Sequence, residues 1–177
     1  MRKLKLQELN RLDVESFKKL EKTPVVIVLD NIRSGLNVGS AFRTADAFAL
    51  EKVILCGITA QPPHREILKT AIGATSSMDW SYVEKTTEAI ATLKKEGYHI
   101  VAVEQAENST LLQDFVLPGN KKTALIFGNE VTGVSEEAME MVDECIEVPQ
   151  FGTKHSLNIS VCIGVVVWDV FKKGAGY

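Results

Sequence analysis

Polar side chains able to do chemistry lie in a loop near the end of the chain. In the segment Val148–Val170 this loop carries Ser156 and Asn158 on either side of Leu157, and the residues from Ile159 onward are almost all apolar. Hydroxyl and amide side chains at a helix start can accept hydrogen bonds from its first N–H groups, or they can present polar atoms to a ligand. Both interpretations, helix cap and ligand site, fit this loop by itself.

Two other stretches place polar residues and glycines directly after an apolar run. The first, Val25–Phe48, contains Arg43, and the second, Ala124–Ser135, contains Glu130. Each begins with a short apolar run, which is typical of a strand buried on both faces. Because the carboxyl ends of parallel strands meet at one edge of a sheet, we expect Arg43, Glu130 and Ser156 to converge there.

The residue types in these stretches suit the handling of an anion or a hydroxyl group. Arg43 carries a guanidinium that stays protonated, so it can stabilise a developing oxyanion or hold a phosphate; otherwise it is an ordinary surface arginine. Asn37 is a candidate helix cap, a candidate ligand, or both, and Glu130 is either an orienting carboxylate or a solvated loop acid. Lys154 and His155 add positive charge that could meet a phosphate, although a lone loop histidine is more often simply exposed.

Several other chemistries lack their sequence signatures. Ser156 and His155 are neighbours in one loop, no acid partner is evident for them, and no GxSxG is present, which argues against a hydrolase. The first apolar run continues into Leu29-Asp-Asn, so there is no GxGxxG turn, and GxxxxGK[ST] is absent as well. The chain therefore lacks the usual signals for dinucleotides and nucleoside triphosphates.

Taken together, the three stretches resemble the motifs of the SpoU family of RNA ribose 2′-O-methyltransferases, within the SPOUT class. Three motifs in the right order are far more specific than any one of them. The resemblance covers the chain after residue 24. The matching residues are Asn37-Val-Gly39 with Arg43-Thr-Ala, then Gly128-Asn-Glu130 with Gly133-Val-Ser135, and finally Val148-Pro149 with Ser156-Leu-Asn158.

This resemblance implies a cofactor and a set of roles. The methyl donor would be S-adenosylmethionine, bound in a bent form in a C-terminal trefoil knot by backbone around Gly128, Val148 and Leu157. Arg43 would act at the ribose oxygen. The residues that would complete the catalytic site, by orienting the arginine and the ribose, are Asn37, Glu130, Ser156 and Asn158. Members of the family form homodimers through the last helix, with the arginine of one subunit near the donor of the other.

Composition predicts a single soluble domain. The chain has 177 residues, of which 45% are hydrophobic and 24% charged, and such a chain is long enough for one well-buried domain. The net charge of −3 gives no support to an RNA partner, although it can conceal a local basic face. The chain begins without the apolar core of a signal peptide, and its longest apolar run is too short to span a bilayer.

The cysteines point to a reducing compartment and to no metal. Cys56, Cys145 and Cys162 lie far apart beside apolar residues, without CxxC spacing and without a histidine at zinc-ligand distance. Such a set argues against both a disulfide framework and a structural metal site. We therefore expect a cytoplasmic protein with no bound metal.

The pattern along the chain predicts an α/β fold with a mainly parallel sheet and helices on both faces. Residues 1–23 are expected to form a charge-rich helical arm in which Asp13 can cap a helix. Residues 24–177 would form the α/β domain, which the resemblance implies is the catalytic domain. The arm is either a solvated helix packed on the core or a contact for RNA or a second subunit.

Strands are expected at 25–29, 53–56, 82–83, 98–103, 123–127 and 145–148. Helices are expected at 64–69, 86–96 and 135–142, and two more are expected to begin at 37 and 159. The segment 108–122 is expected to be a connection with at most one turn of helix.

The resulting hypothesis is an enzyme that methylates a ribose 2′-hydroxyl of RNA, with tRNA favoured over rRNA. The main alternative is a non-catalytic RNA-binding module on the same fold, and a weaker one is a nucleotide enzyme that acts on small molecules. Titration with S-adenosylmethionine separates the last alternative from the other two. We also expect a homodimer, because the apolar residues of Ile159–Val167 surround the whole helix and one domain of this size can cover only one side.

Overall fold

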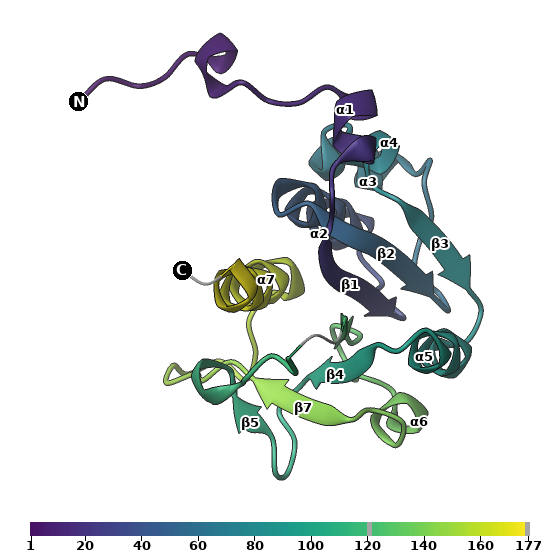
Figure 1. The fold of residues 1–177 in the computed structure, drawn as a ribbon. Coiled ribbons are helices and arrows are strands. Elements are labelled where there is room, and N and C mark those ends of the chain that lie inside the picture. The colour runs from purple at the N-terminus through teal and green to yellow at the C-terminus, as the bar shows by residue number, and fades with distance from the viewer. Residues whose placement is uncertain (120–121, 176–177) are drawn as a thin grey trace.

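The computed structural model describes residues 1–119 and 122–175, and its centre is a parallel sheet. Within those residues seven strands pair in the order β3-β2-β1-β6-β4-β7-β5 (Figure 1), and every pair is parallel. The strands are β1 (Thr23–Asp30), β2 (Leu50–Cys56), β3 (Trp80–Val83), β4 (His99–Val103), β5 (Thr110–Leu111), β6 (Thr123–Phe127) and β7 (Glu144–Glu147).

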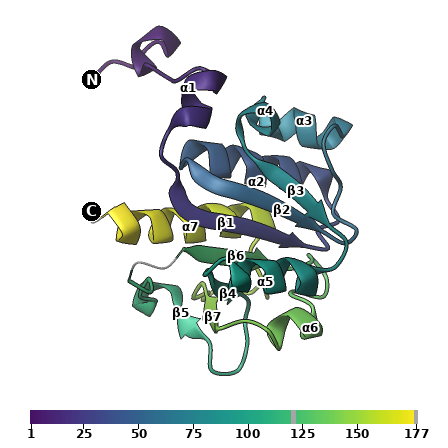
Figure 2. The same cartoon turned by 45° about the vertical axis from the view of Figure 1, so that its right-hand side comes forward.

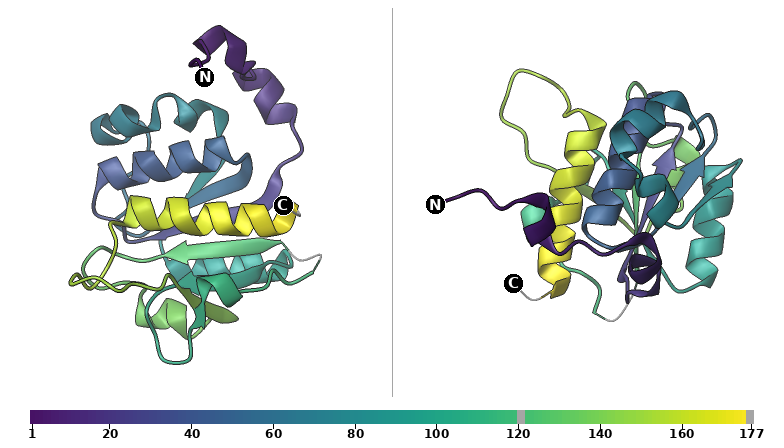
Figure 3. Two further views of the ribbon diagram at one scale, coloured as in Figure 1. Left: turned by 90° about the vertical axis from the view of Figure 1, so that its left-hand side faces the viewer. Right: turned by 90° about the horizontal axis from the view of Figure 1, so that it is seen from above.

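Helices cover both faces of this sheet, as the sequence pattern predicted. The α-helices are α1 (Val14–Lys19), α2 (Gly35–Ala47), α3 (Arg65–Ala71), α4 (Ala74–Ser77), α5 (Thr86–Lys95), α6 (Glu136–Met139) and α7 (Ile159–Ala175). α2 and α7 lie side by side on one face, with α3 packed on α2 (Figure 3). α5 and α6 cover the opposite face (Figure 2). The expected α/β architecture is therefore confirmed.

The core explains why the strands are continuously apolar. In β1, alternate residues such as Ile27 and Val28 point to opposite faces, yet both are fully buried because each face carries helices. β6 lies between β1 and β4 in register. The chain therefore leaves β1 at Asp30, β6 at Phe127 and β4 at Val103 along one edge of the sheet, and this edge brings the following loops together.

The first helix after β1 begins earlier than the sequence suggested. α2 starts at Gly35 and its cap is Ser34, whose side chain accepts a hydrogen bond from the N–H of Asn37 at 3.3 Å. The prediction that Asn37 opens the helix is thus wrong. Because Ser34 supplies the cap, the amide of Asn37 is left free to reach another element.

Two other local features depend on contacts with distant segments. The described part of segment 108–122 contains a single 3₁₀ turn, over Leu112–Asp114, as expected, but it also contains the strand β5, which was not expected, because Thr110 and Leu111 pair with the edge of β7. Among the described residues α5 has no side-chain cap: Lys85 occupies the cap position, and the Thr86 hydroxyl donates to the buried Asp30 carboxylate. Both features come from contacts between segments far apart in sequence.

The N-terminal arm extends away from the sheet (Figures 1 and 3). Asp13 caps α1 as expected, accepting from the N–H of Ser16 at 2.9 Å, and a 3₁₀ turn over Leu6–Leu9 precedes it. Phe17 packs against the core, and the Lys22 ammonium lies 3.2 Å from the centre of its ring. No helix in the described residues combines the length and the apolar character needed to cross a membrane.

Candidate functional site

A cleft of about 510 Å³ opens at the carboxyl edge of the sheet, within the usual size range for small-molecule sites. It lies where β4, β6 and β7 end. Two of the three predicted stretches contribute to it, the loop after β6 and the loop before α7. Its lining residues include six of those predicted for the site, namely Gly128, Glu130, Val148, Ser156, Leu157 and Asn158.

Glu130 fastens the loop after β6 to the beginning of α2. Its carboxylate accepts hydrogen bonds from the N–H of Arg33 at 2.9 Å, the N–H of Ser34 at 3.2 Å and the side-chain amide of Asn37 at 2.9 Å. Burial raises the pKa of Glu130, but these donors outweigh it and hold that pKa below its usual value. Glu130 is therefore an ionised, fully engaged acceptor at the positive end of a helix.

Asn37 continues this chain of hydrogen bonds to the third stretch. The Asn158 amide donates to the Asn37 side-chain oxygen at 3.4 Å. Asn158 also caps α7, because its oxygen accepts from the N–H of Ser160 at 2.9 Å. The structure thus brings Glu130, Asn37 and Asn158 together, one from each predicted stretch. The cap interpretation of the sequence is therefore confirmed for Asn158, which also lines the cleft; its contact with a ligand stays a prediction.

The glycines of the second stretch serve the loop itself. A Cβ on Gly128 would lie 2.0 Å from the N of Val134 and 2.1 Å from the carbonyl carbon of Gly133. Gly128 therefore leaves room for the returning loop. It also lines the cleft, so its expected place beside the donor stays a prediction. Asn129 closes that loop, with paired backbone hydrogen bonds to Gly133 of 2.8 and 2.9 Å.

Buried polar groups hold the loops after β1 and β6 together. Asp30, at the end of β1, is 1% exposed and accepts from the N–H of Ser135 at 2.8 Å. The Asn129 amide donates to the backbone oxygen of Asn31 at 2.6 Å. Because buried polar groups are costly without partners, these bonds fix the loops relative to each other. The cleft wall is therefore preorganised by the chain.

The cleft has an acidic lining. Glu104, Glu130 and Glu147 line it, and no lysine or arginine is found among the described residues that do so. Burial raises the pKa of the Cys162 thiol to about 11, and the Glu104 charge adds to the effect. A negative field of this kind suits a ligand that carries positive charge. Three or more potential metal ligands do not come together anywhere in the described residues.

Arg43 lies apart from this cleft. It is on the third turn of α2, and it is exposed. It lines a separate depression of about 440 Å³ together with Lys69 of α3 and Gly164 of α7. The Arg43 side chain makes no hydrogen bond or ion pair with the described part of the chain. Within one chain, the structure does not bring the predicted arginine to the other predicted site residues.

The sequence argument missed part of the cleft. Glu104 and Gln105 follow β4 and line the cleft between the loops of the second and third motifs. They are a polar pair after an apolar strand, which is the same signal that identified the other stretches. Gln150 and Cys162 line the cleft as well, and their own sequence contexts carry no comparable signal.

Comparison with known proteins identifies the family. A sequence model of the SpoU rRNA Methylase family matches residues 24–168, so the chain belongs to that family. A 23S rRNA (guanosine-2'-O-)-methyltransferase, RlmB, of Coxiella burnetii is 30% identical over 168 residues, which are 93% of this chain and 66% of that protein. The chain spans 63 to 66% of the length of the first curated relatives it matches.

Solved structures share the fold. The A. aeolicus TrmH/SpoU tRNA modifying enzyme superposes with a TM-score of 0.80 at 22% identity, over 92% of this chain and 83% of that one. The AdoMet-bound rRNA methyltransferase from Sinorhizobium meliloti gives a TM-score of 0.79 at 24% identity, over 89% of this chain and 59% of that one. These likenesses place the described fold in the structural class that the motifs predicted.

Proposed function

We propose that this protein transfers a methyl group from S-adenosylmethionine to a ribose 2′-hydroxyl of RNA, with tRNA favoured over rRNA. The observation that carries the proposal is the Glu130–Asn37–Asn158 chain of hydrogen bonds beside a cleft lined by carboxylates. The acidic lining fits S-adenosylmethionine, whose sulfonium and ammonium groups are cationic. The names of the Coxiella burnetii relative and of the A. aeolicus neighbour support rRNA and tRNA, respectively, as substrate classes.

The cofactor, when bound, supplies an activated methyl group, and residues of the chain would hold that cofactor in place. Gly128, Val148 and Leu157 would hold it, since all three line the cleft. Asn37 and Asn158 present amide groups beside it that can orient a ribose. Glu130 is unsuited to accept the hydroxyl proton, because three donors occupy its carboxylate and keep its pKa low. Its role is to position Asn37.

Arg43 is proposed to act on the ribose oxygen from a second subunit. A guanidinium remains protonated, so its role is to stabilise the developing alkoxide and to hold the neighbouring phosphate. The location of Arg43 outside the cleft of its own chain supports action between subunits. Ser156 lines the cleft and completes the proposed catalytic set.

The proposed homodimer would cover an apolar face of α7. Ile163 and Val167 of this helix are buried in the core, whereas Val161, Val165 and Trp168 are 52%, 39% and 53% exposed. Exposed apolar residues in one stripe of a helix are typical of a contact surface. Gly164 of the same helix lines the Arg43 depression, so a partner on α7 would also approach Arg43.

Three further features belong to this proposal. The chain after the third motif would pass through a loop to form the trefoil knot implied by the family resemblance. The activity would lie in residues 24–177, with residues 1–23 as an arm. The protein would act in the cytoplasm, and the free thiols of Cys56, Cys145 and Cys162 support a reducing compartment. No metal is required for the transfer.

The test of the activity is incubation with labelled S-adenosylmethionine and total RNA from cells lacking the protein, followed by mapping of the methylated nucleotide. Label on a ribose of one RNA position is expected. RNA binding without methyl transfer would favour the non-catalytic module instead. Binding of the donor without any RNA product would favour an enzyme that acts on small molecules.

Subunit complementation tests the dimer arrangement. Arg43→Ala and Leu157→Arg each remove one half of the site, and hybrid dimers formed from the two inactive variants contain one intact site. Mixing equal amounts should restore roughly a quarter of the wild-type activity if the arginine acts between subunits. No recovery in a mixture shown by mass spectrometry to contain hybrid dimers would contradict action between subunits.

A further inference from the structure

Glu104 and Gln105 form the part of the cleft wall to which the family motifs give no role. They follow β4, which lies between β6 and β7 in the sheet. The pair therefore stands between the loop that carries Glu130 and the loop that carries Leu157. Both residues line the cleft.

The Glu104 carboxylate is held in a fixed position. One oxygen accepts from the N–H of Val134 at 3.1 Å, and the other accepts from the N–H of Gln105 at 2.9 Å. Gly133 sits directly against it, with φ of +72°, and a Cβ on Gly133 would lie 2.2 Å from the carboxylate oxygen. The second-motif loop thus packs on this carboxylate, and a glycine is required where they touch.

The charge of Glu104 has no partner among the described residues. Glu104 is half-buried and takes part in no ion pair with the described residues. No lysine or arginine of the described chain lines the cleft beside it. A partly buried carboxylate fixed by backbone donors and facing a cleft is suited to bind a cation.

We propose that Glu104 is the subsite for a cationic group of the methyl donor, either its sulfonium or its α-ammonium group. This inference rests on the proposed function. Glu130 is occupied by the first turn of α2, and no hydrogen bond holds the Glu147 side chain to the rest of the described chain. Among the three carboxylates of the lining, Glu104 alone is both fixed in place and open to a ligand's charge.

Gln105 is a positioning residue for the same cleft. Its side-chain amide donates to the backbone oxygen of His155 at 2.7 Å, which ties the loop of the third motif to the end of β4. Loss of this bond should loosen the loop around Leu157 without changing the charge of the cleft. Gln105→Ala therefore reports the effect of loop displacement alone.

Titration calorimetry of the full chain with three ligands tests the assignment. S-adenosylmethionine has both cationic groups, S-adenosylhomocysteine keeps the ammonium and lacks the sulfonium, and methylthioadenosine lacks both. Glu104→Gln should raise the Kd for S-adenosylmethionine about tenfold or more and leave methylthioadenosine within about twofold of the wild type. Loss of affinity for S-adenosylhomocysteine as well identifies the ammonium, and loss for S-adenosylmethionine alone identifies the sulfonium.

Matched variants keep the test decisive. Glu107→Gln removes an exposed carboxylate further along the same loop and outside the cleft lining, so it should change each Kd less than about threefold. Gln105→Ala should weaken all three ligands alike. Glu104→Ala lacks an amide that could repel the N–H of Val134 or Gln105, and it should give the same ligand order as Glu104→Gln. Equal loss for all three ligands in both Glu104 variants, or no loss, would overturn the assignment. Wild-type protein that does not bind S-adenosylmethionine would instead contradict the proposed function.

Discussion

Two hollows in this molecule differ in charge and in how firmly the chain holds their side chains. The cleft at the sheet edge is acidic, and hydrogen bonds from several loops fix Glu130, Asn37 and Asn158. The depression around Arg43 contains Lys69 as well and has no acidic residue in its described lining. Hydrogen bonds within the chain fix the side chains of the cleft, whereas the depression presents the exposed Arg43 side chain, unbonded to the described residues, to a ligand.

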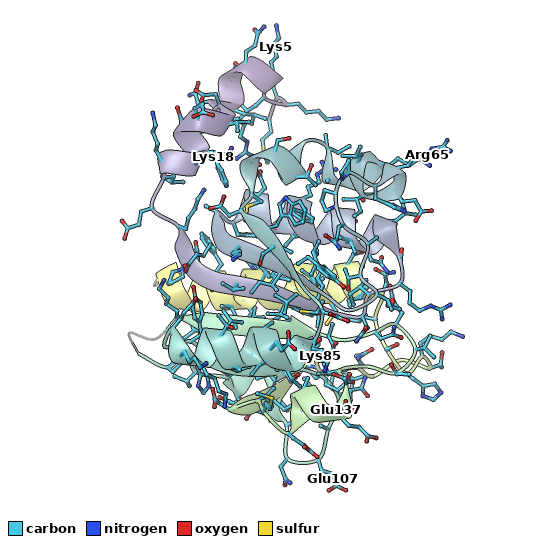
Figure 4. The ribbon with its side chains drawn as sticks, turned by 90° about the vertical axis from the view of Figure 1, so that its right-hand side faces the viewer. Lys5, Lys18, Arg65, Lys85, Glu107 and Glu137 are labelled. Atoms are coloured by element: carbon cyan, nitrogen blue, oxygen red, sulfur yellow. The ribbon has the colours of Figure 1, made fainter. Side chains whose placement is uncertain are left out.

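This difference suggests a division of labour. An acidic preorganised cleft suits a small cationic cofactor, and a basic exposed depression suits an anion such as an RNA phosphate. Arg65 lies on α3, the helix that also carries Lys69, and projects outward, while Lys5 and Lys18 project from the arm (Figure 4). Variants in the cleft should therefore change donor binding, and variants in the depression should change chemistry or RNA binding.

The largest effect is expected from Leu157→Arg. Leu157 is 38% exposed and lines the cleft, so the substitution places a second cation where the donor should pack. Binding of S-adenosylmethionine should be abolished in calorimetry. The matched control is Leu68→Arg on α3, where the leucine is 49% exposed and outside the cleft; this variant should bind as the wild type does. Equal loss of donor binding in both variants would mean that the effect of an added arginine is not specific to the cleft.

Arg43→Ala is expected to lower the rate of methyl transfer and to leave donor binding nearly unchanged. If Arg43 stabilises the alkoxide, the single-turnover rate with saturating RNA should fall about 10²-fold or more, with donor Kd nearly unchanged. Arg43→Lys should recover little, because the ammonium lacks the planar fork that can contact a phosphate and the 2′-oxygen together. A near-normal rate for Arg43→Ala would remove Arg43 from the catalytic set.

Arg65→Ala is the matched control for this experiment. Arg65 begins α3 and is exposed, so its loss should alter RNA affinity and the salt dependence of binding at most. The rate at saturating RNA should stay within a few-fold of the wild type. The same pattern for Arg43→Ala would make Arg43 a phosphate contact only.

Acid should weaken the connection between the second motif and α2. The pKa of Glu130 is lower in the folded chain than its usual value, so its stabilising contribution is present above the usual carboxyl pKa and is lost as pH falls through the lowered one. The Tm of the wild type should exceed that of Glu130→Gln at neutral pH, and the gap should close below about pH 4. A gap that stays constant from pH 7 to pH 3 would contradict this role.

The smallest effect is expected from deletion of residues 1–20. α1 lies beside the amino end of β1 and contacts α4, whereas the cleft lies at the carboxyl ends of the strands. Donor affinity should stay within a few-fold, and Tm should fall modestly because Phe17 no longer covers the core. A large loss of donor affinity would mean that the arm takes part in the cleft.

Much of the fold could be predicted from local sequence. The run Val25–Leu29 is apolar at every position because both faces of its strand are covered, and this pattern identifies a central parallel strand before any contact is known. Asp13 before α1 and Asn158 before α7 are short-range capping signals that the structure bears out. β5 could not be predicted, since its two residues form a strand only by pairing with β7.

The amino-acid sequence alone determined which residues stand at strand ends, and therefore that Glu130, Ser156 and Asn158 would gather at one edge. Only the tertiary structure decided which of the polar residues lie at the cleft and which lie at the separate depression. The packing of α2 against α3 and α7 sets which way each turn of α2 faces, so Asn37 reaches Glu130 while Arg43 lines the other hollow with Lys69. The order of strands decided the place of Glu104, because β4 comes to lie between β6 and β7 through pairings that no local pattern encodes.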